Sequence, residues 1–297
     1  MTKTTVIAKD NEHLEKLIKE ALQAEGLECD LNYIDVSQIK DMTLLFAGFP
    51  KFNGSIDRWD TSNVVNMTSM FMNTNFNSDI SAWNVSNVQS MDQMFRASHF
   101  TGCIAHWNVS KVLNMHSMFR KSCFNGDISA WDVARVQNMR HLFSESLFNN
   151  DVSEWNVSSV VDFSFLFFKT TFNRSVAKWD VSNCKKFQQI FHGSTFLGDI
   201  SMWSISVDSE IEDIFDFVTA HSFKEPNVYH WLLALYDHHN FSKMQATWNE
   251  HFSEYAPMAS GIFATNKAAA QLIHSQWLVR NKNLNVQPGL DFNVSEI

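Results

Sequence analysis

One aromatic pattern recurs every 24 residues, and this internal repeat limits the possible folds more than any other feature of the chain. Two phenylalanines and one tryptophan keep the spacing without exception: Phe52, Phe76, Phe100, Phe124, Phe148, Phe172 and Phe196; Trp59, Trp83, Trp107, Trp131, Trp155, Trp179 and Trp203; Phe71, Phe95, Phe119, Phe143, Phe167, Phe191 and Phe215. Seven units therefore run from Phe52 to Thr219. One unit is too small to bury its own apolar face, whereas stacked neighbours bury a continuous one. The repeat predicts a solenoid.

Within one unit, local patterns predict the secondary structure. The stretch from Ile80 to Val85 is β-branched and aromatic, which favours a short strand. Ser86 is a suitable helix N-cap, and Val88, Met91 and Phe95 follow at i, i+3 and i+7, the spacing of one helical face. The predicted fold class is therefore an α/β repeat solenoid, similar to a leucine-rich repeat, with 24-residue strand-turn-helix coils.

The segment after the predicted strand of each unit could form either an α-helix or a thinner 3₁₀ turn, and the two differ in width. Stacked strands lie about 4.7–4.9 Å apart, whereas packed helices need about 8–10 Å. Helices would therefore force the solenoid to curve with its strands on the concave side. Thinner 3₁₀ turns would leave it straighter. The sequence leaves this choice open.

The repeat also defines the domain organisation and the core. Residues 1–30 are expected to form an N-terminal βα cap, residues 31–215 one partial unit followed by the seven full ones, and residues 216–297 a helical C-terminal extension. In the cap, Thr4–Ala8 is expected to be a strand and Asp10 or Asn11 the N-cap of a helix that ends at Gly26. The predicted structural core consists of Trp59, Trp83, Trp107, Trp131, Trp155, Trp179 and Trp203 with Phe71, Phe95, Phe119, Phe143, Phe167 and Phe191.

Composition and charge narrow the location and the class of partner. The 297 residues carry a formal net charge of −9, which argues against a general nucleic-acid binder and favours a basic partner. The sequence shows no signal peptide and no apolar stretch of about 18 residues, so we expect a cytoplasmic protein that does not contact membranes. The four cysteines follow no pairing rule and are expected to be reduced.

The repeated line Phe-Asn-Gly-Asp-Ile-Ser-x-Trp-Asp-Val-x-x-Val-x-Asn-Met, clearest at Phe124–Met139, resembles the BspA-like repeats of bacterial surface proteins. This family is also described as DUF285 and as a relative of leucine-rich repeats. The resemblance covers about residues 31–215 and implies the solenoid fold and a bacterial or phage-related source. Many members are secreted adhesins, and this chain departs from them because it shows no signal peptide or anchor.

No pattern in the sequence predicts catalysis, a cofactor or a metal. Serine, histidine and aspartate recur with the repeat, so their spacing reflects the scaffold and not a catalytic triad. Asp237, His238 and His239 invite a metal hypothesis, but adjacent histidines point to different helix faces and no ligand motif surrounds them. We therefore expect a protein that is not an enzyme and has no cofactor.

Columns that vary between units while their neighbours stay fixed are candidates for a binding surface. Basic residues gather in such columns between 92 and 143, and two phenylalanines stand in columns that are otherwise mostly polar. The predicted partner-binding residues are Arg96, His106, Lys111, Arg120, Lys121, Arg135, Arg140, Phe165 and Phe168. For each basic residue the alternative is an ordinary solvated side chain, and for the two phenylalanines it is packing against a neighbouring unit.

These observations predict a non-catalytic scaffold that binds another protein. In its most specific form it is a cytoplasmic immunity or antitoxin-type protein that occludes a toxin. One alternative, from the resemblance, is a surface or secreted adhesion protein. A second is an effector or enzyme whose activity lies in residues 216–297.

Overall fold

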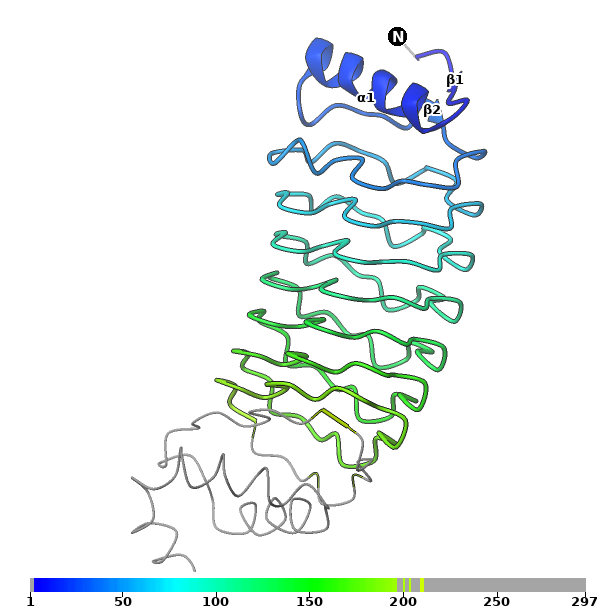
Figure 1. The fold of residues 1–297 in the computed structure, drawn as a ribbon. Helices are drawn as coiled ribbons and strands as arrows, with labels where there is room; N and C mark the ends of the chain where they lie inside the picture. Colours follow the sequence, from blue (N-terminus) through cyan, green and yellow to red (C-terminus); the bar gives the residue numbers. More distant parts are fainter. Residues whose placement is uncertain (1–2, 197–199, 201–202, 204–208, 211–297) are drawn as a thin grey trace, which may run out of the picture. The chain divides into compact units, whose positions relative to one another are not determined.

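The computed structural model describes residues 3–196, 200, 203 and 209–210 of the chain (Figure 1). Three regular elements open this part: strand β1 (Val6–Ile7), helix α1 (Asn11–Glu25) and strand β2 (Ile34–Asp35). β1 and β2 pair in parallel as a two-stranded sheet. The predicted tail helices of residues 216–297 lie outside the described residues. Among the described helices, none is long and apolar enough to cross a membrane.

Capping residues stand at both ends of helix α1, Asp10 before its first residue and Gly26 after its last. The carboxylate of Asp10 accepts a hydrogen bond from the backbone N–H of His13 at 2.8 Å, as an N-cap does. Gly26 follows the last turn with a φ of 91°, a conformation that glycine adopts at little cost. The helix buries Leu14, Ile18, Ala21 and Leu22. The predicted N-terminal βα cap is therefore present, with a strand shorter than expected.

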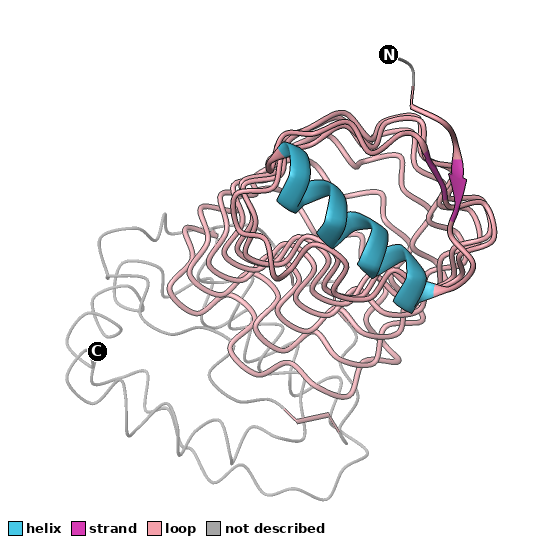
Figure 2. Cartoon of the chain, turned by 90° about the horizontal axis from the view of Figure 1, so that it is seen from above, coloured by secondary structure: helices cyan, strands magenta, loops and turns pink. Residues whose placement is uncertain are grey.

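From β2 onward the described chain winds in coils that stack on one another (Figures 1 and 2). Isolated parallel bridges join residues 24 apart in one unbroken series: Asn66, Ser90, Asn114, Asn138, Asp162, Lys186 and Glu210. The sequence repeat and the structural repeat are therefore the same.

The coils contain neither the strand nor the helix that the local patterns predict, and these two predictions are wrong. Between 36 and 196 the described backbone consists of turns, bends and single bridges. At the expected strand, the N–H of Trp83 bonds back to the carbonyl of Ile80 at 3.1 Å, which bends the chain. At the expected N-cap, Ser86 instead donates its backbone N–H to the side chain of Asn84 at 3.1 Å, closing an Asx turn.

The segment predicted as a helix is a ribbon of turns that we name the turn wall: residues 66–73, 90–97, 114–121, 138–145, 162–169 and 186–193. Alternate N–H groups, such as those of Met91, Gln93 and Phe95, donate to carbonyls of the next coil at 2.8–3.0 Å. The intervening N–H groups, such as those of Met94 and Arg96, donate three residues back within their own coil. This pattern satisfies the backbone without the i to i−4 bonds of an α-helix.

Two positions per coil of the turn wall have a left-handed backbone, with φ between 50° and 65°. They are Ser69, Gln93, Ser117, His141, Phe165 and Gln189 in one column, and Asn73, Ala97, Lys121, Glu145, Lys169 and Gly193 in the other. Neither column contains a β-branched residue or proline. These residue types are the ones that a positive φ disfavours most. The absence of β-branched residues and proline from the two columns is therefore a sequence signal of the left-handed backbone conformation.

The distance between coils explains why a helix does not fit. Aromatic rings of one core column stack on those of the next coil at 5.6–5.9 Å from Phe71 to Phe191. Packed α-helices need about 8–10 Å between their axes. Since every coil is held at the shorter spacing, only a thinner backbone can occupy the turn wall.

The predicted core residues are buried. The seven tryptophans are 3–4% exposed and the six phenylalanines of the second series 0–2%. Each indole N–H also donates to a backbone carbonyl of the preceding coil at 2.9–3.2 Å, so the ladder joins every neighbouring pair from Leu31 to Trp203. The indole column therefore both fills the core and hydrogen-bonds one coil to the next.

Polar columns fix the bends. The asparagine or aspartate that follows each of the first six repeat tryptophans, Trp59 to Trp179, accepts the N–H two residues on, at 3.0–3.2 Å. Asn53 and Asn77 accept a backbone N–H from the following coil at 2.8 Å, which links coils at the edge of the stack. All four cysteines are free thiols, and burial raises the pKa of Cys184 to about 12.

Replacing one indole tests the ladder. Trp131→Ala removes a buried side chain and its bond to the carbonyl of Ile104, so we expect a loss of about 3–5 kcal/mol in the free energy of unfolding. Trp131→Phe keeps most of the packing and removes only the indole bond, because the carbonyl of Ile104 still accepts the backbone N–H of Trp107 at 3.1 Å, so the expected cost is about 0.5–1.5 kcal/mol. Urea denaturation measures both, with the exposed Arg135→Ala as control. An unchanged midpoint in Trp131→Ala would contradict the ladder.

A second substitution tests the left-handed column. Ala97 has a φ of 53°, so Ala97→Val places a β-branched residue there and should destabilise the protein by about 1–2 kcal/mol. Ala97→Gly, the residue that this column has at Gly193, should stay within about 1 kcal/mol of the parent. The two variants are compared by urea denaturation. Equal stability would show that this backbone conformation is wrong.

Candidate functional site

The outer surface of the turn wall holds side chains that vary from coil to coil. We define the variable face as four columns of the wall: 68, 92, 116, 140, 164 and 188; 69, 93, 117, 141, 165 and 189; 72, 96, 120, 144, 168 and 192; 73, 97, 121, 145, 169 and 193. The wall's remaining positions hold the conserved apolar core and the bridging residues. Because the coils are in register, residues 24 apart lie side by side on this face.

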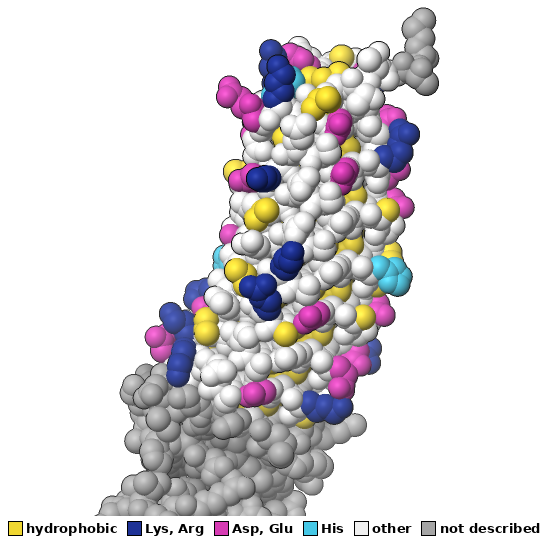
Figure 3. Space-filling model, turned by 90° about the vertical axis from the view of Figure 1, so that its right-hand side faces the viewer, with side chains coloured by type: hydrophobic (Ala, Val, Ile, Leu, Met, Phe, Trp, Pro, Cys, Tyr) yellow, Lys and Arg dark blue, Asp and Glu magenta, His cyan; other side chains and the backbone are white. Residues whose placement is uncertain are grey.

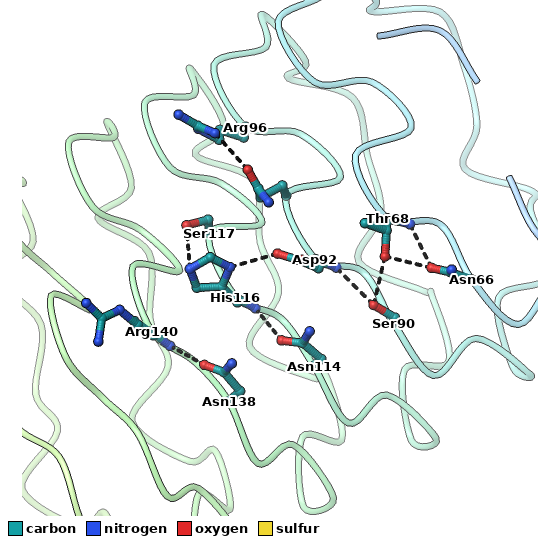
Figure 4. Close-up of polar contacts among 11 residues, drawn as sticks. Asn66, Thr68, Ser90, Asp92, Arg96, Asn114, His116, Ser117, Asn138 and Arg140 are labelled. Atoms are coloured by element: carbon teal, nitrogen blue, oxygen red, sulfur yellow. Dashed lines mark hydrogen bonds and ion pairs between the residues drawn. The ribbon is translucent and has the colours of Figure 1, made fainter. Parts of the chain in front are cut away.

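The upper half of the variable face is a polar network (Figure 4). The hydroxyl of Thr68 contacts that of Ser90 at 3.0 Å, and Ser90 accepts the backbone N–H of Asp92 at 3.4 Å. The carboxylate of Asp92 then lies 2.8 Å from Nδ1 of His116 in the next coil, and Nε2 of His116 lies 3.3 Å from the hydroxyl of Ser117. Side chains from neighbouring coils are thereby joined laterally.

The middle of the face carries ion pairs that bridge coils. Glu145 pairs with Arg120 at 3.1 Å and with Lys121 at 3.3 Å, and Arg140 approaches Asp162 at 3.8 Å. Burial by itself would raise the pKa of the Glu145 carboxyl, but the hydrogen bonds from Arg120 and Lys121 hold it below its ordinary value. This carboxylate is therefore ionised at neutral pH.

The lower part of the face is a row of stacked rings. Phe165 stacks on His141 with ring centroids 4.4 Å apart, and Phe168 stacks on His192 at 5.0 Å. The two phenylalanines meet edge to face at 5.7 Å. Arg140 lies 5.2 Å from the centroid of Phe165, and Lys169 lies 5.0 Å from that of Phe168. We name these six residues the ring cluster.

Several buried polar atoms of this face have no hydrogen-bond partner within the described part of the chain. They are Nε of Arg120, Nδ1 of His141 and the hydroxyls of Ser144 and Ser164. A buried unpaired group costs about 1–3 kcal/mol. Such local costs are typical of surfaces that serve a function rather than stability.

The structure divides the predicted partner-binding residues into two sets. Arg96, Arg120, Lys121, Arg140, Phe165 and Phe168 all lie on the variable face. His106, Lys111 and Arg135 lie in other columns, are exposed, and are not part of it. Lys111 donates to the side chain of Asn87 at 2.6 Å, an ordinary contact within its column.

The sequence prediction did not include several residues of the face, among them Asp92, His116, His141, Glu145 and Lys169. The 24-residue spacing could have revealed three of the contacts, because Asp92–His116, His141–Phe165 and Phe168–His192 are each one repeat apart. For Phe165 and Phe168 the packing alternative is confirmed, whereas a role as anchors stays a prediction. Each packs against a neighbouring coil and each remains partly exposed.

The face offers recognition more readily than chemistry. No cluster of three or more potential metal ligands occurs among the described residues. Five basic and two acidic side chains stand in its four columns, a surplus of three positive charges on a chain with a net charge of −9. In Figure 3, which shows one side of the molecule, basic and acidic side chains are interspersed singly among uncharged ones. The variable face therefore carries a net positive charge.

The pH dependence of stability tests the environment of His141. Burial lowers the pKa of His141 to about 4, Arg120, Arg140 and His116 act in the same direction, and Glu145 opposes them. A histidine in the unfolded chain has a pKa of about 6.5, so between about pH 6.5 and 4 the unfolded state binds more protons. The stability that this group contributes is complete above pH 6.5 and is lost as the pH falls towards 4.

His141→Gln, the residue of the same column at Gln93 and Gln189, should therefore show a smaller fall in Tm between pH 7 and pH 5 than the parent chain. His106→Gln, at an exposed position, should retain the fall of the parent. Thermal unfolding followed by circular dichroism measures all three. Equal falls in His141→Gln and the parent would contradict the burial of this imidazole.

Comparison with known proteins supports the repeat. The family model described as "Mycoplasma protein of unknown function, DUF285" matches residues 14–124 and 120–231, two tandem regions that span most of the chain. Searches of curated proteins and of solved structures find no match. The tandem matches agree with the BspA-like resemblance of the repeated line, and the chain belongs to the DUF285 family.

Proposed function

We propose that this chain is a non-catalytic repeat scaffold that binds another protein through the variable face. One observation carries the proposal. The core columns keep apolar residues in every described coil, and three of them keep the same aromatic residue, whereas the four columns of the variable face change in charge, size and polarity from one coil to the next. Exposed positions that vary on a fixed scaffold are where a repeat protein builds a binding surface.

The proposal includes the architecture that presents this face. The coils form one continuous leucine-rich-repeat-like solenoid through the seventh unit, with turns in place of helices. The described bridges support this view, because they continue at a constant interval of 24 residues from Asn66 to Glu210. Such a stack places equivalent side chains of successive coils in straight rows, which suits the extended surface of a partner protein.

In its most specific form, the partner is a toxin and the chain is a cytoplasmic immunity or antitoxin-type protein. The net charge of −9 supports this form, since it favours approach to a basic enzyme. The basic variable face would then select an acidic patch on that enzyme. Rescue of growth when the chain is produced together with a toxin from its native host tests this form.

Matched substitutions test the general proposal. Arg96→Ser and Arg120→Ser together remove two charges from the variable face and introduce the residue that this column has at Ser144. Lys111→Ser and Arg135→Ser together remove the same charge outside the face and introduce the residue that their column has at Ser159. The two doubly substituted chains therefore differ in location and not in chemistry.

Affinity capture from the native host, followed by mass spectrometry, compares the parent with both chains. We expect the parent and the Lys111/Arg135 chain to capture the same protein, and the Arg96/Arg120 chain to capture at least about tenfold less. Circular dichroism confirms that both chains are folded. Equal capture by the two would refute binding through the variable face.

A further inference from the structure

The ring cluster on the variable face is unlike the rest of that face. Phe165 and Phe168 stand in columns that hold serine, glutamine, histidine, arginine or methionine in the other described coils. Neither phenylalanine belongs to the buried core, and both are partly exposed. A large apolar side chain that remains at the surface of a repeat scaffold is a candidate anchor for a partner.

The backbone conformation at Phe165 disfavours a bulky side chain, so this residue carries a local cost in stability. Its φ is 62°, and a bulky side chain is disfavoured in the left-handed region. Other coils place Ser117 or Gln189 at the same position. The hydroxyl of Ser164 beside it is buried without a partner within the described part of the chain. The ring contacts with His141 and Arg140 offset part of this local cost, which the polar residues of the other coils do not carry to the same degree.

The arrangement of the rings limits what can bind. His141 and Arg140 occupy the faces of the Phe165 ring, and His192 and Lys169 those of the Phe168 ring. The two phenylalanines also meet each other edge to face, and the other edges of these partly exposed rings remain for a partner. The edge of an aromatic ring carries partial positive charge, so it favours carboxylates and the faces of other rings.

The two cations of the cluster strengthen the same preference. Arg140 has only the distant carboxylate of Asp162, at 3.8 Å, as an ion-pair partner among the described residues. Lys169 has none in that part of the chain. A guanidinium that lies over a ring keeps its N–H groups directed outward, where they can bind a carboxylate in a bidentate manner.

We propose that the ring cluster is the anchor site for an acidic protein segment that carries an aromatic side chain. This inference rests on the proposed function and specifies its partner. The aromatic side chain of the segment packs against the edges of Phe165 and Phe168, while its carboxylates pair with Arg140 and Lys169. The positive surplus of the variable face draws the segment in from solution.

The geometry favours a protein segment over a single-stranded nucleic acid, which would also be attracted by cations and aromatic rings. Nucleobases bind such surfaces by stacking on open ring faces. In the ring cluster those faces are already covered by His141, His192, Arg140 and Lys169.

Fluorescence anisotropy with defined probes tests the proposal on the full chain. The first probe is a labelled peptide of aspartate and glutamate with two central phenylalanines. A second replaces the phenylalanines with serine, a third replaces the acids with lysine, and a fourth is an oligouridylate of similar charge. We expect the first probe to bind at least about tenfold more tightly than the other three.

Substitutions taken from the same columns locate the binding. Phe165→Gln with Phe168→Ser should weaken the first probe about tenfold, because both rings are lost while the residues introduced are those of Gln189 and Ser144. Leu147→Thr removes an exposed apolar side chain outside the variable face, introduces the residue that its column has at Thr171, and should leave binding unchanged. Circular dichroism and thermal unfolding confirm that both variants are folded.

Each other outcome overturns the inference. If the oligouridylate binds more tightly than the first probe, the face binds nucleic acid. If the lysine peptide binds more tightly than the first probe, the partner segment is basic and not acidic. Equal binding by the parent and the Phe165/Phe168 variant, or no binding of the first probe by the parent, would exclude the cluster as its anchor. If capture from the host still depends on Arg96 and Arg120 in those cases, the proposed function stands and only this inference fails.

Discussion

The spacing between coils, set by backbone hydrogen bonds from each coil to the next, is the constraint on which the rest of this structure depends. Alternate residues of the turn wall donate to the following coil, and the indole of each tryptophan donates to the preceding one. These bonds hold the rings of Phe95 and Phe119 at 5.8 Å. Flat aromatic rings stack well at that spacing, which suits the three aromatic columns of the core.

The sequence predicted the repeat, its period and its core because these follow from the composition of columns, which is independent of backbone conformation. It misled on the helix because Val88, Met91 and Phe95 face the core at intervals that a helix and a ribbon of turns both satisfy. The stacking distance was the better guide, since a helix cannot fit between neighbours held at strand-like spacing. The exclusion of β-branched residues at positive φ, as at Gln93 and Ala97, was a second signal in the same columns.

The candidate site was predictable to the extent that it follows from residues 24 apart. Basic and aromatic residues in variable columns pointed to Arg120 and Phe168, whereas the partners that surround them needed coordinates. Glu145 reaches Arg120 across 25 residues rather than 24, a diagonal contact that depends on side-chain length and backbone direction. His141 drew no attention as a sequence position, because its low pKa arises from burial and from Arg120 and Arg140 in neighbouring rows.

The direction of the hydrogen bonds in the turn wall has an electrostatic consequence. In each of its coils, peptide groups such as Asp92–Gln93 and Met94–Phe95 direct their N–H towards the later coil and their carbonyl towards the earlier one. Neighbouring strands of an ordinary sheet largely cancel such dipoles, whereas here they add from coil to coil, as they do along an α-helix. The turn wall therefore has a net dipole whose positive end points towards its C-terminal coils. This dipole moment increases with each added repeat.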